Sequence, residues 1–268
     1  MQRDSASFTL LVATVLCVAC SVLVAGAAVA LRPLQVANKR LDRQKNVLLA
    51  ASLIERGKAD SDTIKATFGE SIERQLIDTT TGEPTTLEDA GLEENYDPRD
   101  ATKKPELTVQ IPAEEDVAGI KKKAKYAYVY KVLGEGGAVE QIVVPIYGKG
   151  LWSTVYGFLS VDADGETVRG VTFYEHGETP GLGGEVENPD WQASWVDKSI
   201  YGDAGEVELS VIKGSAGDGP DADYQIDGLS GATITSKGVS HMIDYWLGPH
   251  GFGPYLKSLG GEGAGTDG

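Results

Sequence analysis

An uncharged stretch of about 24 residues, from Phe8 to Leu31, is the feature that most constrains this chain. A helix needs about 20 consecutive apolar residues to cross the hydrocarbon core of a bilayer, so residues 8–31 are predicted to form a transmembrane helix. A cleaved signal peptide is the main alternative, because the alanine-rich part near residues 25–30 could hold a cleavage site. The apolar region of such a signal is normally only ~7–15 residues long, which favours the uncleaved anchor.

Both cysteines of the chain, Cys17 and Cys20, lie inside this stretch. They are three positions apart and share one face of a helix. A lipoprotein signal is a third alternative, since the pair faintly resembles a lipobox, but we interpret both as small packing residues rather than redox groups. The rest of the chain has no thiol, and its three histidines are scattered without metal-ligand spacing. Neither a disulfide nor a metal site is therefore expected.

The formal net charge of −16 would repel a polyphosphate backbone, so nucleic-acid binding is not expected. Arg3 is the only basic residue before the apolar stretch, and five follow it closely: Arg32, Lys39, Arg40, Arg43 and Lys45. Counted by the positive-inside rule, this distribution places the C-terminal part in the cytoplasm. A later basic run is predicted to be solvated surface and comprises Lys121, Lys122, Lys123 and Lys125.

The part after the span is predicted to be an α+β fold, with an antiparallel sheet flanked by helices. Helices are expected at 34–56, 62–68, from Asn188, and at 236–247. Strands that alternate around glycine-containing turns predict two hairpins, 126–133 with 139–146 and 152–161 with 167–174. Short strands are expected near 207–212 and 224–227. The chain is divided into an N-terminus (1–7), a transmembrane helix (8–31), a helical and mixed part (32–120), a domain (121–258) and a disordered tail (259–268).

The stretch Asp227-Gly-Leu-Ser-Gly-Ala-Thr-Ile-Thr-Ser236 is predicted to be a strand end, a tight turn and a helix start. Gly228 and Gly231 permit backbone conformations that other residues avoid. Four hydroxyl side chains crowd the start of the helix, where free amide groups and the helix dipole favour an anion. The residues alone therefore fit either a phosphate site or a capped turn.

The loop Glu175–Pro189 contains four glycines and two prolines directly after a predicted strand. Long glycine-rich loops in a compact domain are commonly functional. Such a loop would suit a flat ligand that needs close approach of the backbone, and a plain surface loop is the alternative.

The segments HGETPGLG and DGLSGATITS resemble the FMN-binding domain family, which is shared by the C subunit of sodium-pumping NADH:quinone reductases and by the G subunit of Rnf electron-transport complexes. The resemblance implies that the phosphate of FMN is esterified to the hydroxyl of Thr233. A threonine hydroxyl is a poor unassisted nucleophile and the motif contains no histidine base, so a separate flavin transferase is expected to attach the flavin.

The resemblance implies roles for further residues. Asp227 and Ser230 match the attachment consensus and are expected to matter for recognition by the transferase, with Gly231 and Ala232 completing the motif before Thr233. It also places residues of the glycine-rich loop near the flavin: Glu178, Thr179, Gly181 and Leu182. Trp152 and Ser153 are weaker candidates, for which packing of the sheet is the alternative.

The resemblance extends over most of the chain and implies an electron-carrier subunit of a membrane oxidoreductase that couples electron transfer from NADH to ubiquinone with sodium export. The flavin would carry out the redox chemistry, so no side chain is expected to be catalytic. Other subunits of the complex are the expected partners, in a bacterial inner membrane with residues 1–7 in the cytoplasm and the flavin domain in the periplasm. A G subunit of the Rnf type and a non-redox, membrane-anchored ligand-binding protein remain alternatives.

Overall fold

The computed structural model describes residues 5–262, so Arg3 and residues 263–268 of the expected tail lie outside it. Contacts divide the chain into two units, Met1–Arg43 and Gln44–Gly268. Helix α1 (Ala6–Ala50) is long and apolar enough in its first part to cross a membrane.

The helix expected at 34–56 is the continuation of α1, and it ends at Ala50 rather than at residue 56. Ser52 has a left-handed φ of 58°, and the amide of Leu53 donates to the carbonyl of Leu48. This bond back across the last turn closes the helix, so the chain turns away six residues earlier than expected.

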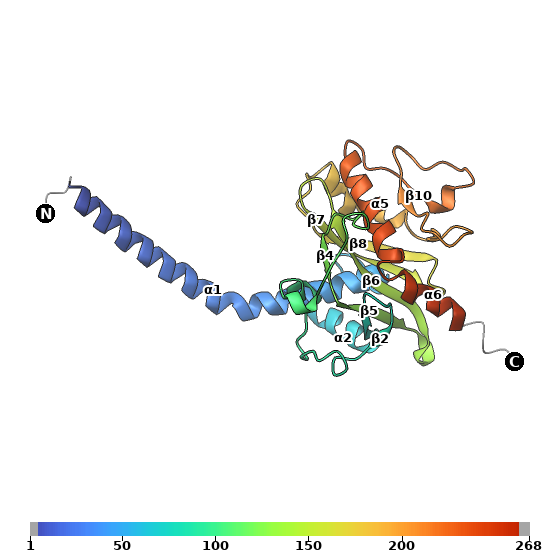
Figure 1. Cartoon of the computed structure of the whole chain (residues 1–268), viewed down its shortest axis with the longest axis horizontal. Coiled ribbons are helices and arrows are strands. Elements are labelled where there is room, and N and C mark those ends of the chain that lie inside the picture. The colour runs from blue at the N-terminus through green and yellow to red at the C-terminus, as the bar shows by residue number, and fades with distance from the viewer. Residues whose placement is uncertain (1–4, 263–268) are drawn as a thin grey trace. The chain divides into compact units, whose positions relative to one another are not determined.

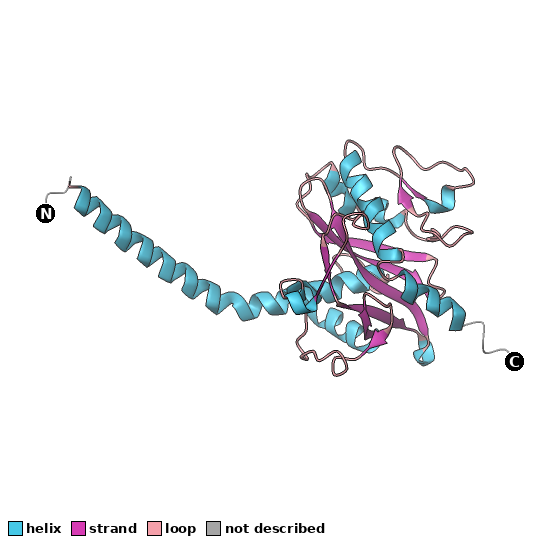
Figure 2. Ribbon diagram, in the orientation of Figure 1, coloured by secondary structure: helices cyan, strands magenta, loops and turns pink. Residues whose placement is uncertain are grey.

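The second unit is built on a six-stranded antiparallel sheet with the order β2-β1-β5-β6-β7-β8 (Figures 1 and 2). The strands are β1 (Ile72–Asp78), β2 (Pro84–Thr85), β5 (Tyr126–Leu133), β6 (Val139–Lys149), β7 (Thr154–Asp162) and β8 (Val168–Glu175). Both predicted hairpins are confirmed: β5 pairs antiparallel with β6, with Tyr130 opposite Val143, and β7 pairs antiparallel with β8, with Phe158 opposite Thr172. The sheet with flanking helices is the predicted fold class.

Strand β1 was not expected, although it pairs with β5 along its whole length. Its residues Glu73, Arg74 and Gln75 interrupt the apolar alternation that marked the other strands. The remaining short elements are α2 (Ser61–Ser71), α3 (Pro98–Ala101), β3 (Thr108–Gln110), β4 (Lys122–Ala124), β9 (Ser210–Val211), β10 (Gln225–Ile226) and the 3₁₀ turns η1 (Pro105–Leu107), η2 (Glu135–Gly137), η3 (Gly183–Glu187) and η4 (Ala222–Tyr224). The strand expected near 207–212 is thus reduced to β9, which pairs in parallel with β10.

Three helices follow the sheet in sequence: α4 (Pro189–Ala193), α5 (Thr233–Leu247) and α6 (Gly253–Glu262). Helix α4 begins after Asn188, whose side chain caps it by accepting from the amide of Asp190, as predicted. Helix α5 begins three residues before the expected start at 236. The expected disordered tail is wrong for residues 259–262, which belong to α6.

Each face of the sheet buries its own apolar layer. One layer joins the inward side chains of β5–β8 to α5, where Val239, Met242, Ile243 and Trp246 are buried as their helical spacing predicted. The opposite face contacts α2, with Phe68 and Tyr130 at 6.1 Å between ring centroids. Because both faces are covered, consecutive residues of a central strand, such as Val143 and Val144 of β6, are both buried.

Lys123 corrects the prediction that the basic run is solvated surface. Its side chain is buried, and its Nζ donates to the carbonyl of Thr79 at 2.6 Å and to that of His250 at 2.5 Å. The flanking Lys121, Lys122 and Lys125 are not buried. Lys123 is the exception because carbonyls from two distant segments accept hydrogen bonds from its ammonium and so compensate its burial.

Candidate functional site

Three segments meet at one end of the β6–β8 part of the sheet. The turn 150–153 connects β6 to β7, the loop 176–188 leaves β8, and α5 begins next to both. Because consecutive strands run antiparallel, the end of β6, the start of β7 and the end of β8 lie at the same end of the sheet. The sequence-predicted motif and the glycine-rich loop are therefore neighbours in space.

The carboxylate of Glu178 joins these three segments. Its Oε1 accepts from the amides of Trp152 at 2.9 Å and Ser153 at 3.2 Å, and its Oε2 accepts from the amide of Leu151 at 3.2 Å. The hydroxyl of Thr235 donates to the same Oε2 at 2.6 Å. Burial raises the pKa of Glu178, but the hydrogen bonds to the carboxylate outweigh it, so the pKa lies below the ordinary value.

Two glycines make room for this carboxylate. A Cβ on Gly150 would lie 2.6 Å from Glu178 Oε1, and a Cβ on Gly183 would lie 2.6 Å from Thr235 Oγ1 and 2.9 Å from Glu178 Oε2. These distances are shorter than van der Waals contact allows, so any larger residue would push the loops off the carboxylate. These two glycines therefore allow the turn 150–153 and the loop 176–188 to pack closely around the carboxylate.

The first turn of α5 has no side-chain cap. Its N-cap residue is Ala232, which follows the left-handed Gly231 (φ 70°). Within residues 5–262 no acceptor is found for the amides of Thr233, Ile234 and Thr235. Three amide donors are thus presented together at the positive end of the helix dipole, an arrangement that suits an anion.

Exposed apolar side chains surround this helix start. Leu151 is 43% exposed, Trp152 66%, Leu182 43% and Ile234 58%. Leu182 Cδ2 would lie 2.9 Å from a Cβ on Gly231, so the glycine-rich loop touches the turn before α5. Several large exposed apolar side chains at one place usually mark a site that a ligand or a partner protein covers.

Most sequence-predicted site residues converge here. Thr233 and Ser230 are exposed beside the uncapped amides, and Ser153 Oγ accepts from the amide of Gly177 at 2.6 Å. The carbonyl of Thr179 accepts from the amides of Leu182 and Gly184, which closes the turn that contains Gly181 (φ 76°).

Asp227 points elsewhere. Its carboxylate accepts from the hydroxyl of Ser215 and, at 2.6 Å, from the amide of Ala216, while its carbonyl accepts from Trp191 Nε1. It therefore anchors the strand end before the motif. The role of Thr235 could not be predicted from the sequence, because its bond to Glu178 joins residues 57 positions apart.

Comparison with known proteins places these segments in a family. Residues 150–248 match the model of the FMN-binding domain, a range that runs from the glycine beside Glu178 to the end of α5. The C subunit of the Na⁺-translocating NADH-quinone reductase of Pasteurella multocida is 46% identical over 258 residues, covering 96% of each chain. The C subunit from Pseudomonas aeruginosa is also 46% identical, covering 96% of this chain and 97% of its own. The chain belongs to this family of C subunits.

Solved structures agree with this assignment. The crystal structure of Shewanella oneidensis NqrC matches with a TM-score of 0.73 at 36% identity, covering 83% of this chain and 98% of that one. The C subunit from Parabacteroides distasonis matches with a TM-score of 0.63 at 27% identity, covering 85% and 96%. The predicted resemblance is thereby confirmed, and the protein is an FMN-binding subunit of an oxidoreductase complex.

Proposed function

We propose that this protein carries FMN as a phosphoester on Thr233 and passes electrons within a membrane complex that couples oxidation of NADH by ubiquinone to sodium export. The observation that carries the proposal is the exposed hydroxyl of Thr233 beside the three unpaired amides of an uncapped helix. A phosphodiester on that oxygen would be an anion at the positive end of the helix. The membership in an FMN-binding family supplies the identity of the group.

The surrounding side chains fit the rest of an FMN molecule. The amides of Thr233, Ile234 and Thr235 would hold the phosphate, and the exposed Trp152 and Leu182 offer apolar surface for a flat ring. Lys237 is exposed one helical turn after Thr233, a spacing at which side chains of a helix are neighbours. Its ammonium adds positive charge on the side of the phosphate.

Attachment has a chemical requirement that this chain does not meet alone. The new bond joins Thr233 Oγ1 to phosphorus, and the hydroxyl proton must leave. A free phosphate monoester would have to expel water, so the flavin has to arrive as an activated phosphoanhydride, of which a flavin dinucleotide is the simplest form. The expelled nucleotide phosphate then balances the reaction, and a flavin transferase supplies the base.

Once bound, the flavin supplies the redox chemistry. The chain's own contribution is to hold the phosphate, to limit the positions of the ring and to keep one edge accessible to partner subunits. The covalent bond also keeps the cofactor from being lost to dilution, which suits a domain on the periplasmic side. Homology to the C subunits favours this complex over the Rnf type.

The test is the substitution Thr233→Val, which keeps the shape of the side chain and removes the only atom that can bond to phosphorus. The purified variant should fold and insert, yet show no flavin fluorescence on a denaturing gel. Mass spectrometry of the peptide from Asp227 to Lys237 should find an FMN-sized adduct on Thr233 of the wild type. An adduct on Ser230 or Thr235 would overturn the assignment.

A further inference from the structure

Glu178 has no free hydrogen-bonding capacity toward a ligand. A carboxylate has about four acceptor sites, and the three amides of residues 151–153 together with the Thr235 hydroxyl use four. Only 5% of the residue is exposed. The family resemblance placed Glu178 beside the flavin. Its geometry instead suits a role in holding together the segments that border the site.

The four bonds connect every segment that borders Thr233. The turn 150–153 carries Leu151 and Trp152, and the loop that contains Glu178 carries Leu182. The fourth bond reaches the first turn of α5 through Thr235. One side chain thus sets the relative position of the three segments.

The bond to Thr235 also sets the direction of Thr233. Successive residues of an α-helix are rotated by about 100°, so two residues apart they face nearly opposite directions. Thr235 is 1% exposed and held inward by Glu178, which leaves Thr233 facing outward. The Thr235 hydroxyl, held against the carboxylate, does not cap the helix, and within the described residues the first amides of α5 stay free.

We propose, on the basis of the function proposed above, that Glu178 is a positioning residue for flavin attachment. Its negative charge is needed because only a carboxylate accepts three amides and a hydroxyl at once, whereas a glutamine has a single acceptor oxygen. It acts through Thr235 and the 150–153 turn, and it does not touch the reacting atoms itself.

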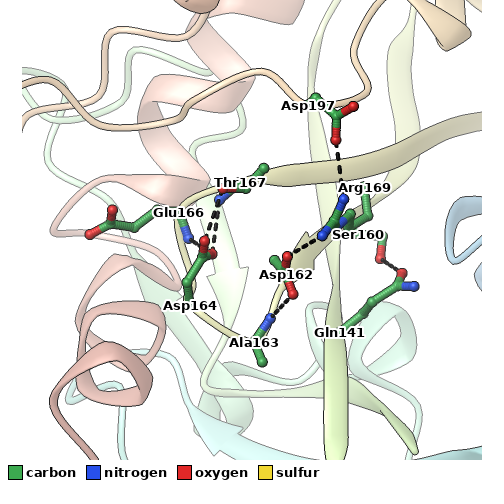
Figure 3. A network of polar contacts seen from close by, with 9 residues as sticks. All are labelled: Gln141, Ser160, Asp162, Ala163, Asp164, Glu166, Thr167, Arg169 and Asp197. Atoms are coloured by element: carbon green, nitrogen blue, oxygen red, sulfur yellow. Dashed lines mark hydrogen bonds and ion pairs between the residues drawn. The ribbon is translucent and has the colours of Figure 1, made fainter. Parts of the chain in front are cut away.

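The chain offers a matched control at the other end of the β7–β8 hairpin. The carboxylate of Asp164 accepts from the amides of Glu166 and Thr167 and from the hydroxyl of Thr167, as Figure 3 shows. It lies in the turn between Asp162 and Val168, whereas the flavin site lies where β7 begins and β8 ends. Asp164→Asn therefore removes the same kind of interaction at a distance from Thr233.

The experiment compares full-length wild type, Glu178→Gln and Asp164→Asn, each incubated with a purified flavin transferase and a flavin dinucleotide. Covalent flavin is followed over time on denaturing gels, at saturating acceptor protein and well below each unfolding midpoint. Because small misplacement of a reacting group is costly, the turnover rate with Glu178→Gln should fall by about tenfold or more. Asp164→Asn should lose about as much thermal stability as Glu178→Gln, yet its rate of flavin attachment should stay within about twofold of wild type.

Thr235→Val provides a second variant if Glu178→Gln does not fold. It keeps the carboxylate and its three amide bonds but cuts the link to α5, so attachment should slow several-fold and still reach completion. Wild-type rates for both Glu178→Gln and Thr235→Val would overturn the positioning role, as would an equal loss in Asp164→Asn. Flavin that persists in Thr233→Val would instead contradict the proposed function.

Discussion

Glu178 and Lys123 are both buried and ionisable, and each is held by polar groups from distant segments. Glu178 accepts amide and hydroxyl protons, whereas Lys123 donates to the carbonyls of Thr79 and His250. A buried charge without such partners would strongly oppose folding. These two side chains therefore tie together loops that the sheet alone would leave apart.

Lys123 makes the stability of the fold depend on pH. Burial lowers its pKa to about 8, although the nearby Asp78 and Glu115 raise it. An unfolded lysine has a pKa of about 10.4, so between these values the unfolded state binds more protons and the free energy of unfolding rises with pH. Thermal unfolding at pH 7.5 and pH 9 should show this rise in wild type and a smaller one in Lys123→Met. Parallel curves for the two proteins would contradict the assignment.

Helix α5 reaches the site because small residues let it lie directly on β6. A Cβ on Gly238 would stand 2.3 Å from the carbonyl oxygen of Lys149, and one on Gly148 would stand 2.9 Å from Met242 Cβ. Trp246 Nε1 donates to the carbonyl of Tyr147 at 2.7 Å and fixes the far end of the helix. The position of Thr233 thus depends on close contact along the whole element.

This contact predicts opposite effects for two glycine substitutions in helices. Gly238→Ala should destabilise the protein by about 1–3 kcal/mol, because the added methyl group meets backbone that cannot move freely. Gly69→Ala in α2 has nothing within 4 Å and should stabilise it by up to about 1 kcal/mol, since alanine favours the helix. Equilibrium unfolding in urea measures both, and a neutral Gly238→Ala would argue against the tight packing of α5 on β6.

At the scale of the whole molecule, α1 continues without a break from the apolar stretch to Ala50. The basic residues that follow Leu31 therefore lie on a continuous helix instead of a flexible loop. Counted simply, they favour a cytoplasmic domain, whereas membership in the family of C subunits favours a periplasmic one. We propose the periplasmic orientation, with the first residues in the cytoplasm.

A reporter fused after Gly268 tests this orientation in the intact complex. Alkaline phosphatase, which is active only outside the cytoplasm, should be active in the fusion. A fluorescent protein that matures only in the cytoplasm should remain dark in the same position. A bright fluorescent fusion without phosphatase activity would place the domain inside and contradict the proposal.

Features that arise from local periodicity and local turn chemistry could be predicted from the amino-acid sequence. An uncharged run of sufficient length predicted the long apolar helix, alternation around glycine turns predicted both hairpins, and helical spacing predicted the buried face of α5. The motif around Thr233 also identified the family. These predictions succeeded because burial of apolar side chains follows the repeat of the element that carries them.

The partners of polar groups, in contrast, emerge only from the folded arrangement of the chain. Strand β1 is held by its neighbours despite the polar run from Glu73 to Gln75. Lys123 is buried where two distant carbonyls accept from it, and Thr235 bonds to a carboxylate 57 residues earlier. A hydroxyl, amide or charge has many possible partners, and its choice depends on which segments the fold brings within about 3 Å. These pairings bring two separate glycine-rich motifs together into one site. Because they join distant segments, they leave no periodic pattern in the sequence from which they could be predicted.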